Sequence, residues 1–485
     1  MPAARPNIVL ITTDQQRWDT CGPLAPSFMR TPHFDNLARE GITFSSAYAD
    51  CPICVPSRVS IMTGKTVFAH DDPCFDPSTR FIDNATSLPG CLGDLGYQTI
   101  AVGKMHFEPQ RARHGFQEML LPEDYYRQRR ASGHDLQPMR HGLGQNELYP
   151  GMATVPEALT LTSWISEQCV EFIRERRDPT APFFMWCSYS KPHPPLDPPE
   201  PYYSMYRNCD IPEPVCGDWS TPERLPESMK RFWQSWSGDL LPAEIIREAR
   251  AAYYGLITQC DYNMGRVLAA LQDRGLLDDT LILYTTDHGE YLGDHHGLSK
   301  CYFHEPSAHL PFLLRLPKSW EGRQPGSTCA APATLADVLP TLVSAAGGTA
   351  PEGCDGRNLL AVARGEEAPR PFVVATHNRP PHHSYLGITD GRYKYIWYPE
   401  GSAEQFFDLE SDPRELHDLA GKPEVGETQV RLRAQMVAWL AEHGPQYLDE
   451  GSLPARPLAG DTETERRNHA WPGYHTEGWT GDVRH

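Results

Sequence analysis

The sequence predicts an α/β fold in which a large, mostly parallel mixed sheet is sandwiched by helices, followed by a small C-terminal antiparallel sheet with one helix. Short apolar runs that end in polar residues alternate with longer segments of helical period, which is typical of βα units. After about Pro369 the pattern changes to short strands separated by tight turns. The first observation predicts the large sheet, and the second predicts a smaller subdomain.

Apolar runs define the expected central strands of the large sheet. Each run is too continuously apolar for one of its faces to meet water, so helices should cover both faces of the sheet. The expected strands are Asn7–Thr13, Gln98–Val102, Pro182–Ser188 and Thr280–Thr286.

Helices are expected in the longer segments between these strands. The first spans Pro32–Glu40, where Thr31 can act as the cap, a proline suits the first turn and a glycine follows the last residue. Two more are expected at Leu159–Arg176 and Ala243–Leu276. Residues 197–242 are rich in Pro, Trp and charges without clean periodicity, and they predict an ordered excursion over the surface.

The C-terminal part of the chain shows a different pattern. The segments PFVVAT, SYLGIT, RYKYIWY and QFFDL predict short antiparallel strands, and a helix is expected near Glu427–Glu442. We therefore divide the chain into a larger domain, residues 1–368, and a C-terminal α+β subdomain with a tail, residues 369–485.

Composition and charge argue against several classes of function. The 485 residues include 44 Lys and Arg against 63 Asp and Glu, a formal charge of −19, so no nucleic-acid partner is expected. No window approaches the roughly 18 uninterrupted apolar residues that span a bilayer, so no membrane partner is expected. The 13 cysteines are odd in number and scattered, which suits reduced thiols.

The two ends of the chain lead to expectations about location and assembly. The apolar segment Ile8–Ile11 meets Asp14 too soon to be the core of a signal peptide, so a cytoplasmic location is expected. The tail from Arg466 to His485 is rich in Trp, Tyr and His. Such a tail could pack on another surface of the protein or on a second subunit, so a homo-oligomer is one possible assembly.

Polar residues directly follow two of the expected strands. Asp14-Gln15 follows the first strand and Asp287-His288 follows the last. Ligands of doubly wound sheets bind beyond the carboxyl ends of the strands, so the two pairs can meet there. Either aspartate alone could simply cap a turn or a helix. Together the pairs offer two carboxylates, an amide oxygen and an imidazole nitrogen, and this combination predicts a site for a divalent cation.

The segment from Cys51 to Lys65 has three interpretations. Cys51 and Cys54 could be buried thiols before a helix. They could form a redox or zinc pair, although a zinc site needs a second such pair and the chain has no other CxxC. In the third interpretation Pro56 lies in the first turn of a helix, so Cys54 stands at the helix N-terminus, where free N–H groups favour an anion or a nucleophile. Arg58, one turn into the helix, could stabilise the anion or nucleophile at Cys54.

This segment, Cys54-Val-Pro-Ser-Arg58 followed by a short helix and Thr63-Gly64, resembles the signature of type I sulfatases in the alkaline phosphatase superfamily. The resemblance extends over about residues 5 to 420. The other matching pieces are the opening strand Asn7–Asp14, Gly103-Lys104-Met105-His106, Lys191-Pro192-His193, Asp287-His288-Gly289-Glu290 with Lys300, and the C-terminal segments Gly387–Tyr395 and Phe407–Pro413.

The resemblance implies an alkaline phosphatase-like fold and a metal-dependent sulfuric ester hydrolase. In the family the matching cysteine is converted to formylglycine, whose hydrate attacks sulfur, so Cys54 would become the nucleophile. The implied partners are a small-molecule sulfate ester and a formylglycine-generating enzyme. The implied ligands of one divalent metal ion are Asp14, Gln15, Cys54, Asp287 and His288.

The resemblance also implies roles for the neighbouring residues. A sulfate ester is anionic, so an anionic nucleophile needs nearby cations to approach it. Asp287 would accept the proton of the nucleophile, His193 with Lys300 would assist the leaving alcohol, and His106 would be the base that releases sulfate. The implied catalytic residues are Cys54, Arg58, Lys104, His106, His193 and Lys300.

Gln15 and His288 depart from the commonest sulfatase pattern and resemble the branch that includes phosphonate monoester hydrolases. Hydrolysis of phosphonate monoesters or phosphodiesters is therefore one alternative, although Ser57 keeps the sulfatase serine. A noncatalytic anion-binding protein is a second alternative if Cys54 is unmodified. Because an imidazole nitrogen shifts preference towards first-row ions, Mn²⁺ is expected at the metal site, with Ca²⁺ or Mg²⁺ as alternatives.

Overall fold

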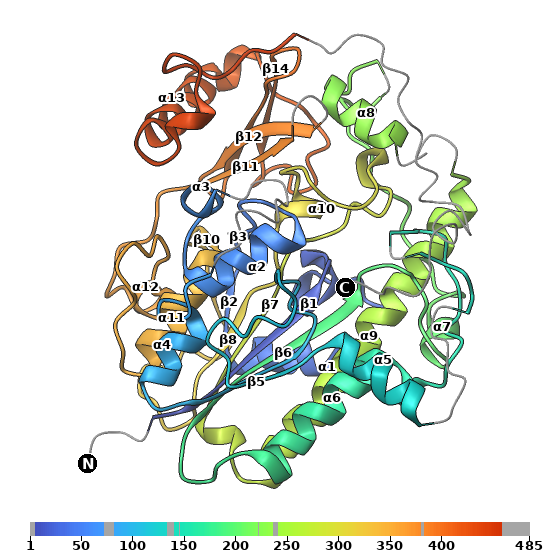
Figure 1. Ribbon diagram of the computed structural model, residues 1–485. Helices are drawn as coiled ribbons and strands as arrows, with labels where there is room; N and C mark the ends of the chain where they lie inside the picture. Colours follow the sequence, from blue (N-terminus) through green and yellow to red (C-terminus); the bar gives the residue numbers. More distant parts are fainter. Residues whose placement is uncertain are drawn as a thin grey trace.

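The computed structural model describes residues 5–71, 82–132, 140–144, 146–221, 223–235, 241–379 and 383–457. Its centre is an eight-stranded mixed sheet in the order β5-β4-β6-β1-β7-β8-β2-β9 (Figure 1). The predicted central strands correspond to β4, β6, β1 and β7, which are neighbours and pair in parallel. The strands of this sheet are β1 (Asn7–Asp14), β2 (Ile42–Phe44), β4 (Gln98–Gly103), β5 (Glu118–Leu120), β6 (Phe183–Pro192), β7 (Thr280–Thr286), β8 (Leu313–Arg315) and β9 (Ser327–Cys329).

Side chains of β1 alternate between two hydrophobic clusters, one on each face of the sheet. Val9 and Ile11 pack with one layer of helices, and Ile8 and Leu10 pack with the other. All four are 0% exposed, which explains why the run carries no polar alternation. The first layer contains α1 (Pro32–Glu40), α5 (Pro122–Ala131), α6 (Leu161–Glu171) and α9 (Ala243–Asp273), and the second contains α2 (Cys54–Thr63), α4 (Leu88–Asp94), α11 (Val338–Ala345) and α12 (Leu359–Ala363).

The helix predicted over Pro32–Glu40 is confirmed as α1, but its predicted cap is wrong. The Thr31 hydroxyl donates to Asp35 (3.2 Å) and accepts nothing from the helix. Instead Asp261, in the middle of α9, accepts from two backbone N–H groups of the first turn at 2.8 to 3.2 Å. A carboxylate that is distant in sequence therefore satisfies the helix terminus.

The other two predicted helices are confirmed with altered ends. Helix α6 begins at Leu161 and continues as a π-helix over Phe172–Arg176, and α9 ends at Asp273. In its described part, the predicted surface excursion contains two α-helices that the sequence pattern did not predict, α7 (Tyr202–Met205) and α8 (Glu227–Ser235).

The C-terminal strands form an antiparallel meander in the order β11-β12-β13-β14. Lys394 of this sheet is 0% exposed and pairs with Glu305 (2.7 Å) and Glu415 (2.8 Å). Glu305 opens α10 (Glu305–Ala308) in the connection between β7 and β8, so the buried Lys394–Glu305 ion pair links the small sheet to the larger domain. The elements are β11 (Val373–Arg379), β12 (His383–Thr389), β13 (Tyr393–Tyr398), β14 (Ala403–Asp408) and α13 (Gly426–His443).

These features confirm the predicted fold class of a large mixed sheet between helices with a small antiparallel sheet and a helix. Short elements near the junction of the two sheets are β3 (Ala47–Tyr48), β10 (Ala333–Thr334) and α3 (Val67–His70). The domain boundary at residue 368 stays a prediction, and the tail from Arg466 to His485 lies outside the described residues. Within the described ranges no helix is long and apolar enough to cross a membrane.

Candidate active site

The carboxyl ends of β1 and β7 bring the two predicted metal-binding pairs together. The strands are adjacent and parallel, with Thr13 opposite Thr286, so the aspartate that follows each strand emerges at the same edge of the sheet. The chain then turns at Gln15 (φ 68°), whose backbone N–H donates to Asp287 Oδ1 at 3.1 Å. The predicted meeting of Asp14 with Asp287 is confirmed.

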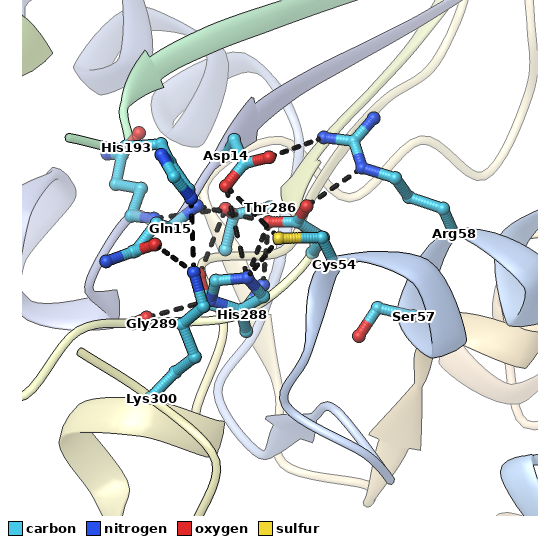
Figure 2. A network of polar contacts seen from close by, with 12 residues as sticks. Asp14, Gln15, Cys54, Ser57, Arg58, His193, Thr286, His288, Gly289 and Lys300 are labelled. Atoms are coloured by element: carbon cyan, nitrogen blue, oxygen red, sulfur yellow. Dashed lines mark hydrogen bonds and ion pairs between the residues drawn. The ribbon is translucent and has the colours of Figure 1, made fainter. Parts of the chain in front are cut away.

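Cys54 reaches the same place as the first residue of α2 (Figure 2). Its Sγ lies 3.1 Å from His288 Nε2 and 3.8 Å from Asp14 Oδ1. One ligand atom from each of Asp14, Cys54, Asp287 and His288 lies within 4.8 Å of the others, and all four residues are buried. We call these four residues the Cys54 cluster.

The Cys54 cluster fits a divalent metal ion. The carbonyl of Gly289 accepts from His288 Nδ1 at 3.0 Å, which assigns the proton to Nδ1 and leaves the Nε2 lone pair facing the cluster. Two carboxylates and one imidazole nitrogen are ligands that suit a first-row ion. Gln15 lies beside them, and its Oε1 accepts from Lys300 Nζ at 2.6 Å.

Two buried cations hold the carboxylates of the cluster. Arg58 donates from Nε to Asp287 Oδ2 (2.9 Å) and from a terminal nitrogen to Asp14 Oδ2 (3.2 Å), and Lys104 Nζ lies 2.7 Å from the same Asp14 oxygen. Burial alone would raise the pKa of the Asp14 carboxyl, but the Lys104 ammonium and the Arg58 guanidinium outweigh burial and hold this pKa well below its usual range. Asp14 is therefore ionised, as a metal ligand must be.

A second pair, Lys300 and His193, lies beside the cluster. Lys300 Nζ is 3.2 Å from His193 Nε2, while the carbonyl of Pro194 accepts from His193 Nδ1 at 2.9 Å. Burial, Lys300 and Lys104 hold the pKa of His193 well below its usual range. Burial opposes the charge of Lys300, but Cys54 and Asp14 outweigh it and raise the pKa of Lys300. The pair is thus a protonated amine next to a neutral imidazole.

The remaining predicted residue, His106, lies two positions beyond Lys104. It is partly buried and adopts a left-handed backbone conformation (φ 61°) that is uncommon for a residue other than glycine. Such conformations often persist where the surrounding structure requires a particular side-chain placement. Its role as the base stays a prediction.

Glu290 lies in the matched segment Asp287–Glu290, but the sequence alone predicts no role for it. Its Oε1 accepts from the backbone N–H groups of Leu292 (2.9 Å) and Ser299 (2.6 Å), and its Oε2 accepts from Gln15 Nε2. Glu290 therefore fixes which end of the Gln15 amide faces the cluster. Only the folded structure shows this contact, because the two residues are 275 positions apart.

Substitution Glu290→Gln is expected to lower metal affinity by about 10- to 100-fold, the usual effect of removing a group that orients a metal ligand. Glutamine has one acceptor oxygen, so it cannot serve both Gln15 and the backbone N–H groups. Elemental analysis after dialysis against a metal buffer would measure the change. Glu352→Gln, at an exposed position, is the matched control. Unchanged metal affinity in the Glu290 variant would contradict the orienting role.

Comparison with known proteins places this geometry in a family. The family described as sulfatase matches residues 6–348, and the C-terminal region described for N-sulphoglucosamine sulphohydrolase matches residues 293–442. An arylsulfatase of Clostridium perfringens is 32% identical over 472 residues, covering 93% of this chain and 97% of the relative. A choline-sulfatase of Rhizobium meliloti is 29% identical and covers 90% of this chain and 86% of the relative.

Among solved structures, a phosphonate monoester hydrolase from Silicibacter pomeroyi superimposes with a TM-score of 0.78 at 24% identity, covering 90% of this chain and 96% of that one. This likeness shows the shared fold. The family match spans most of the chain and includes every residue of the Cys54 cluster. The resemblance drawn from the sequence is thereby confirmed: the chain belongs to the sulfatase family and is a sulfuric ester hydrolase.

Proposed function

We propose that this sulfatase hydrolyses small-molecule sulfate esters through a formylglycine made from Cys54, with one divalent metal ion held by Asp14, Gln15, Asp287 and His288. The observation that carries the proposal is the position of Cys54, which opens α2 and lies 3.1 Å from His288 among buried carboxylates. A formylglycine-generating enzyme is the implied partner. A cytoplasmic location and a homo-oligomer stay predictions.

Hydrated formylglycine at position 54 would provide the attacking oxygen. The metal ion would act as a Lewis acid that polarises the ester and favours the ionised nucleophile. The surroundings of Cys54 suit an anion. Burial and Asp14 would raise the pKa of the thiol, but the ammonium groups of Lys300 and Lys104 outweigh them and lower it. The same charges, with the N-terminus of α2, would favour an anionic oxygen at position 54.

The buried cations have separable roles. Lys104 and Lys300 carry ammonium groups beside the cluster, where they would donate to the nonbridging oxygens of a sulfate ester. Arg58 already donates from each of its three nitrogens, to Asp287, to Asp14, and to the Lys104 carbonyl. We therefore assign Arg58 to positioning the metal-binding carboxylates, with its predicted contact to the nucleophile left as a prediction.

The Lys300–His193 pair is suited to the leaving alcohol. As the S–O bond breaks, negative charge develops on the leaving oxygen, and a proton donor or a close cation stabilises it. Lys300 is protonated and donates to His193 Nε2, so the pair would place a cation and a proton donor beside the leaving oxygen. A cavity lined by His193, Lys104, Tyr125 and Tyr126 opens beside the pair and offers space for the alcohol.

Substitution His193→Ala is expected to lower kcat/KM by an amount that depends on the leaving group of the substrate. For an alkyl sulfate, whose alcohol is a poor leaving group, kcat/KM should fall by about 10²- to 10⁴-fold. For 4-nitrophenyl sulfate the decrease should be much smaller, because nitrophenolate leaves without a proton. His296→Ala, a partly buried histidine outside the Cys54 cluster, is the control. Equal losses on both substrates would show that His193 does not protonate the leaving group.

A second candidate function, hydrolysis of phosphonate monoesters, rests on Gln15 and His288. The test is a comparison of kcat/KM for 4-nitrophenyl sulfate, a sugar sulfate, a phenylphosphonate monoester and a phosphodiester on the same metal-loaded preparation. We expect a sulfate ester to give the highest value. A phosphonate that exceeds every sulfate by orders of magnitude would replace the primary function. Lack of activity together with an unmodified Cys54 would favour an anion-binding protein.

A further inference from the structure

The loop that carries His193 has few backbone donors of its own. Three of the four residues that follow Lys191 are prolines, which have no N–H group. The backbone carbonyls of residues 191–197, which we call the His193 loop, therefore need donors from side chains or from other segments. Because His193 is one half of the Lys300–His193 pair, the groups that hold this loop also place the imidazole.

Lys191 supplies donors to this loop. It lies at the carboxyl end of β6, and its Nζ donates to the carbonyl oxygens of Pro195 (2.6 Å) and His193 (3.4 Å) and to Asp197 Oδ1. An ammonium group has three N–H bonds, so all three are used within the His193 loop. The side chain thereby connects the start of the loop to its end.

Asp197 is held from its other side by His141. His141 Nε2 lies 3.1 Å from Asp197 Oδ2, and His141 Nδ1 accepts from the Leu143 backbone N–H at 3.0 Å. Because Nδ1 is an acceptor, Nε2 carries the proton of the ring and donates to the carboxylate. The side chains of Lys191 and Asp197 are only 18% and 11% exposed, so water and salt screen their attraction weakly. The ion pair thus fixes the His193 loop against a neighbouring segment of the domain.

The imidazole of His193 takes its direction from the same loop. Its Nδ1 donates to the Pro194 carbonyl at 2.9 Å, and its Nε2 faces Lys300 Nζ at 3.2 Å (Figure 2). Lys191 holds the carbonyls on either side of that acceptor, those of His193 and Pro195. A shift of the backbone here would therefore carry His193 Nε2 away from Lys300, and a displacement of about 1 Å can lower a rate by about 10²-fold.

We propose that Lys191 and Asp197 are positioning residues for the protonation of the leaving alcohol. Their ion pair holds the His193 loop, and the loop holds His193 Nε2 next to Lys300. Neither residue belongs to the Cys54 cluster, so the nucleophile and the metal ligands should be unaffected by their loss. The inference rests on the proposed role of His193 in sulfate ester hydrolysis, and it adds the groups that set the position of the imidazole.

The test is Lys191→Met, which keeps an unbranched side chain and removes its ammonium group. The value of kcat/KM for an alkyl sulfate should fall by about 10- to 100-fold, whereas the value for 4-nitrophenyl sulfate should stay within a few-fold, because nitrophenolate leaves without a proton. Asp197→Asn, which keeps the shape of the side chain, should give the same difference between substrates with a smaller loss. Lys318→Met is the matched control, since Lys318 is an exposed lysine that pairs with Asp278 at 2.8 Å.

A double substitution separates positioning from a general loss of structure. In a His193→Ala background, Lys191→Met should change kcat/KM for the alkyl sulfate by less than about threefold, because the group that Lys191 positions is already gone. Equal losses of the single variant on both substrates would overturn the proposal. Losses that multiply in the double variant would overturn it as well. If Lys191→Met does not fold, Asp197→Asn takes its place in each measurement.

Hydrogen exchange followed by mass spectrometry tests the loop without any substrate. The peptide that covers residues 190–198 should exchange faster in Lys191→Met than in the parent chain or in Lys318→Met. Unchanged exchange would overturn the proposal even if turnover falls. Failure of the parent chain to hydrolyse any sulfate ester would refute the proposed function instead, and the exchange measurement would still decide whether Lys191 holds the loop.

Discussion

Substitution Cys54→Ala is expected to lower kcat/KM for a sulfate ester by about 10⁴-fold or more, the usual effect of removing a nucleophile. The side chain removed is the one that contacts His288 and Asp14 at the centre of the cluster. The fold should persist, because alanine is smaller than cysteine and favours a helix. Much of the metal binding should also persist, since Asp14, Asp287 and His288 remain. Turnover, metal content and circular dichroism on the same preparation would test all three expectations.

Cys51→Ala is the matched control. Cys51 is 0% exposed and packs in the hydrophobic cluster beneath the C-terminal sheet, so its loss should leave kcat/KM within a few-fold. Equal loss of activity from both substitutions, with zinc lost in each, would instead support a CxxC metal pair. Intact-protein mass spectrometry adds a second check, because conversion of the thiol to an aldehyde lowers the mass and hydration restores most of the loss. An unconverted Cys54 in the native host would contradict the proposed nucleophile.

The central strands could be predicted from the sequence because their burial is complete. β1 and β7 lie between two helical layers, so they contain no polar face, and a continuous apolar run is a strong local signal. The convergence of Asp14 and Asp287 followed from the same signal, because parallel neighbouring strands end at one edge of the sheet. Elements of this kind are set by local composition and need no knowledge of distant contacts.

Contacts between distant residues could not be predicted in this way. A threonine directly before a helix commonly acts as its N-cap, which is why the sequence predicts this role for Thr31. In the folded chain the Asp261 carboxylate lies at the same helix terminus and accepts from its backbone N–H groups, while the Thr31 hydroxyl donates to Asp35. The role of Glu290 likewise depends on its contact with Gln15, which is 275 positions away in the sequence. Helix α8 is amphipathic but only nine residues long, which is shorter than the window of about 11 to 18 residues in which a helical period can be recognised.

Removal of the metal ion with a chelator is expected to abolish hydrolysis, with activity returning on reconstitution better with Mn²⁺ than with Ca²⁺. The reason is the imidazole of His288, whose Nε2 faces the cluster because its Nδ1 proton is held by the Gly289 carbonyl. Ca²⁺ prefers about six to eight oxygen ligands, whereas a nitrogen ligand favours first-row ions. Steady-state kinetics on samples loaded with each metal, with elemental analysis of the protein as isolated, would measure the order.

Substitution His288→Asn supplies the decisive comparison, because it replaces the nitrogen ligand with an amide oxygen while Asp14 and Asp287 stay in place. The preference for Mn²⁺ over Ca²⁺ should narrow or reverse in this variant. The ion found in the isolated protein can differ from the ion that gives the highest activity, since metal availability also decides occupancy. If Ca²⁺ restores the parent enzyme best and His288→Asn leaves the order unchanged, His288 is not a metal ligand. The Cys54→Ala result would be unaffected by that outcome, so the assignments of the nucleophile and of the metal site can fail separately.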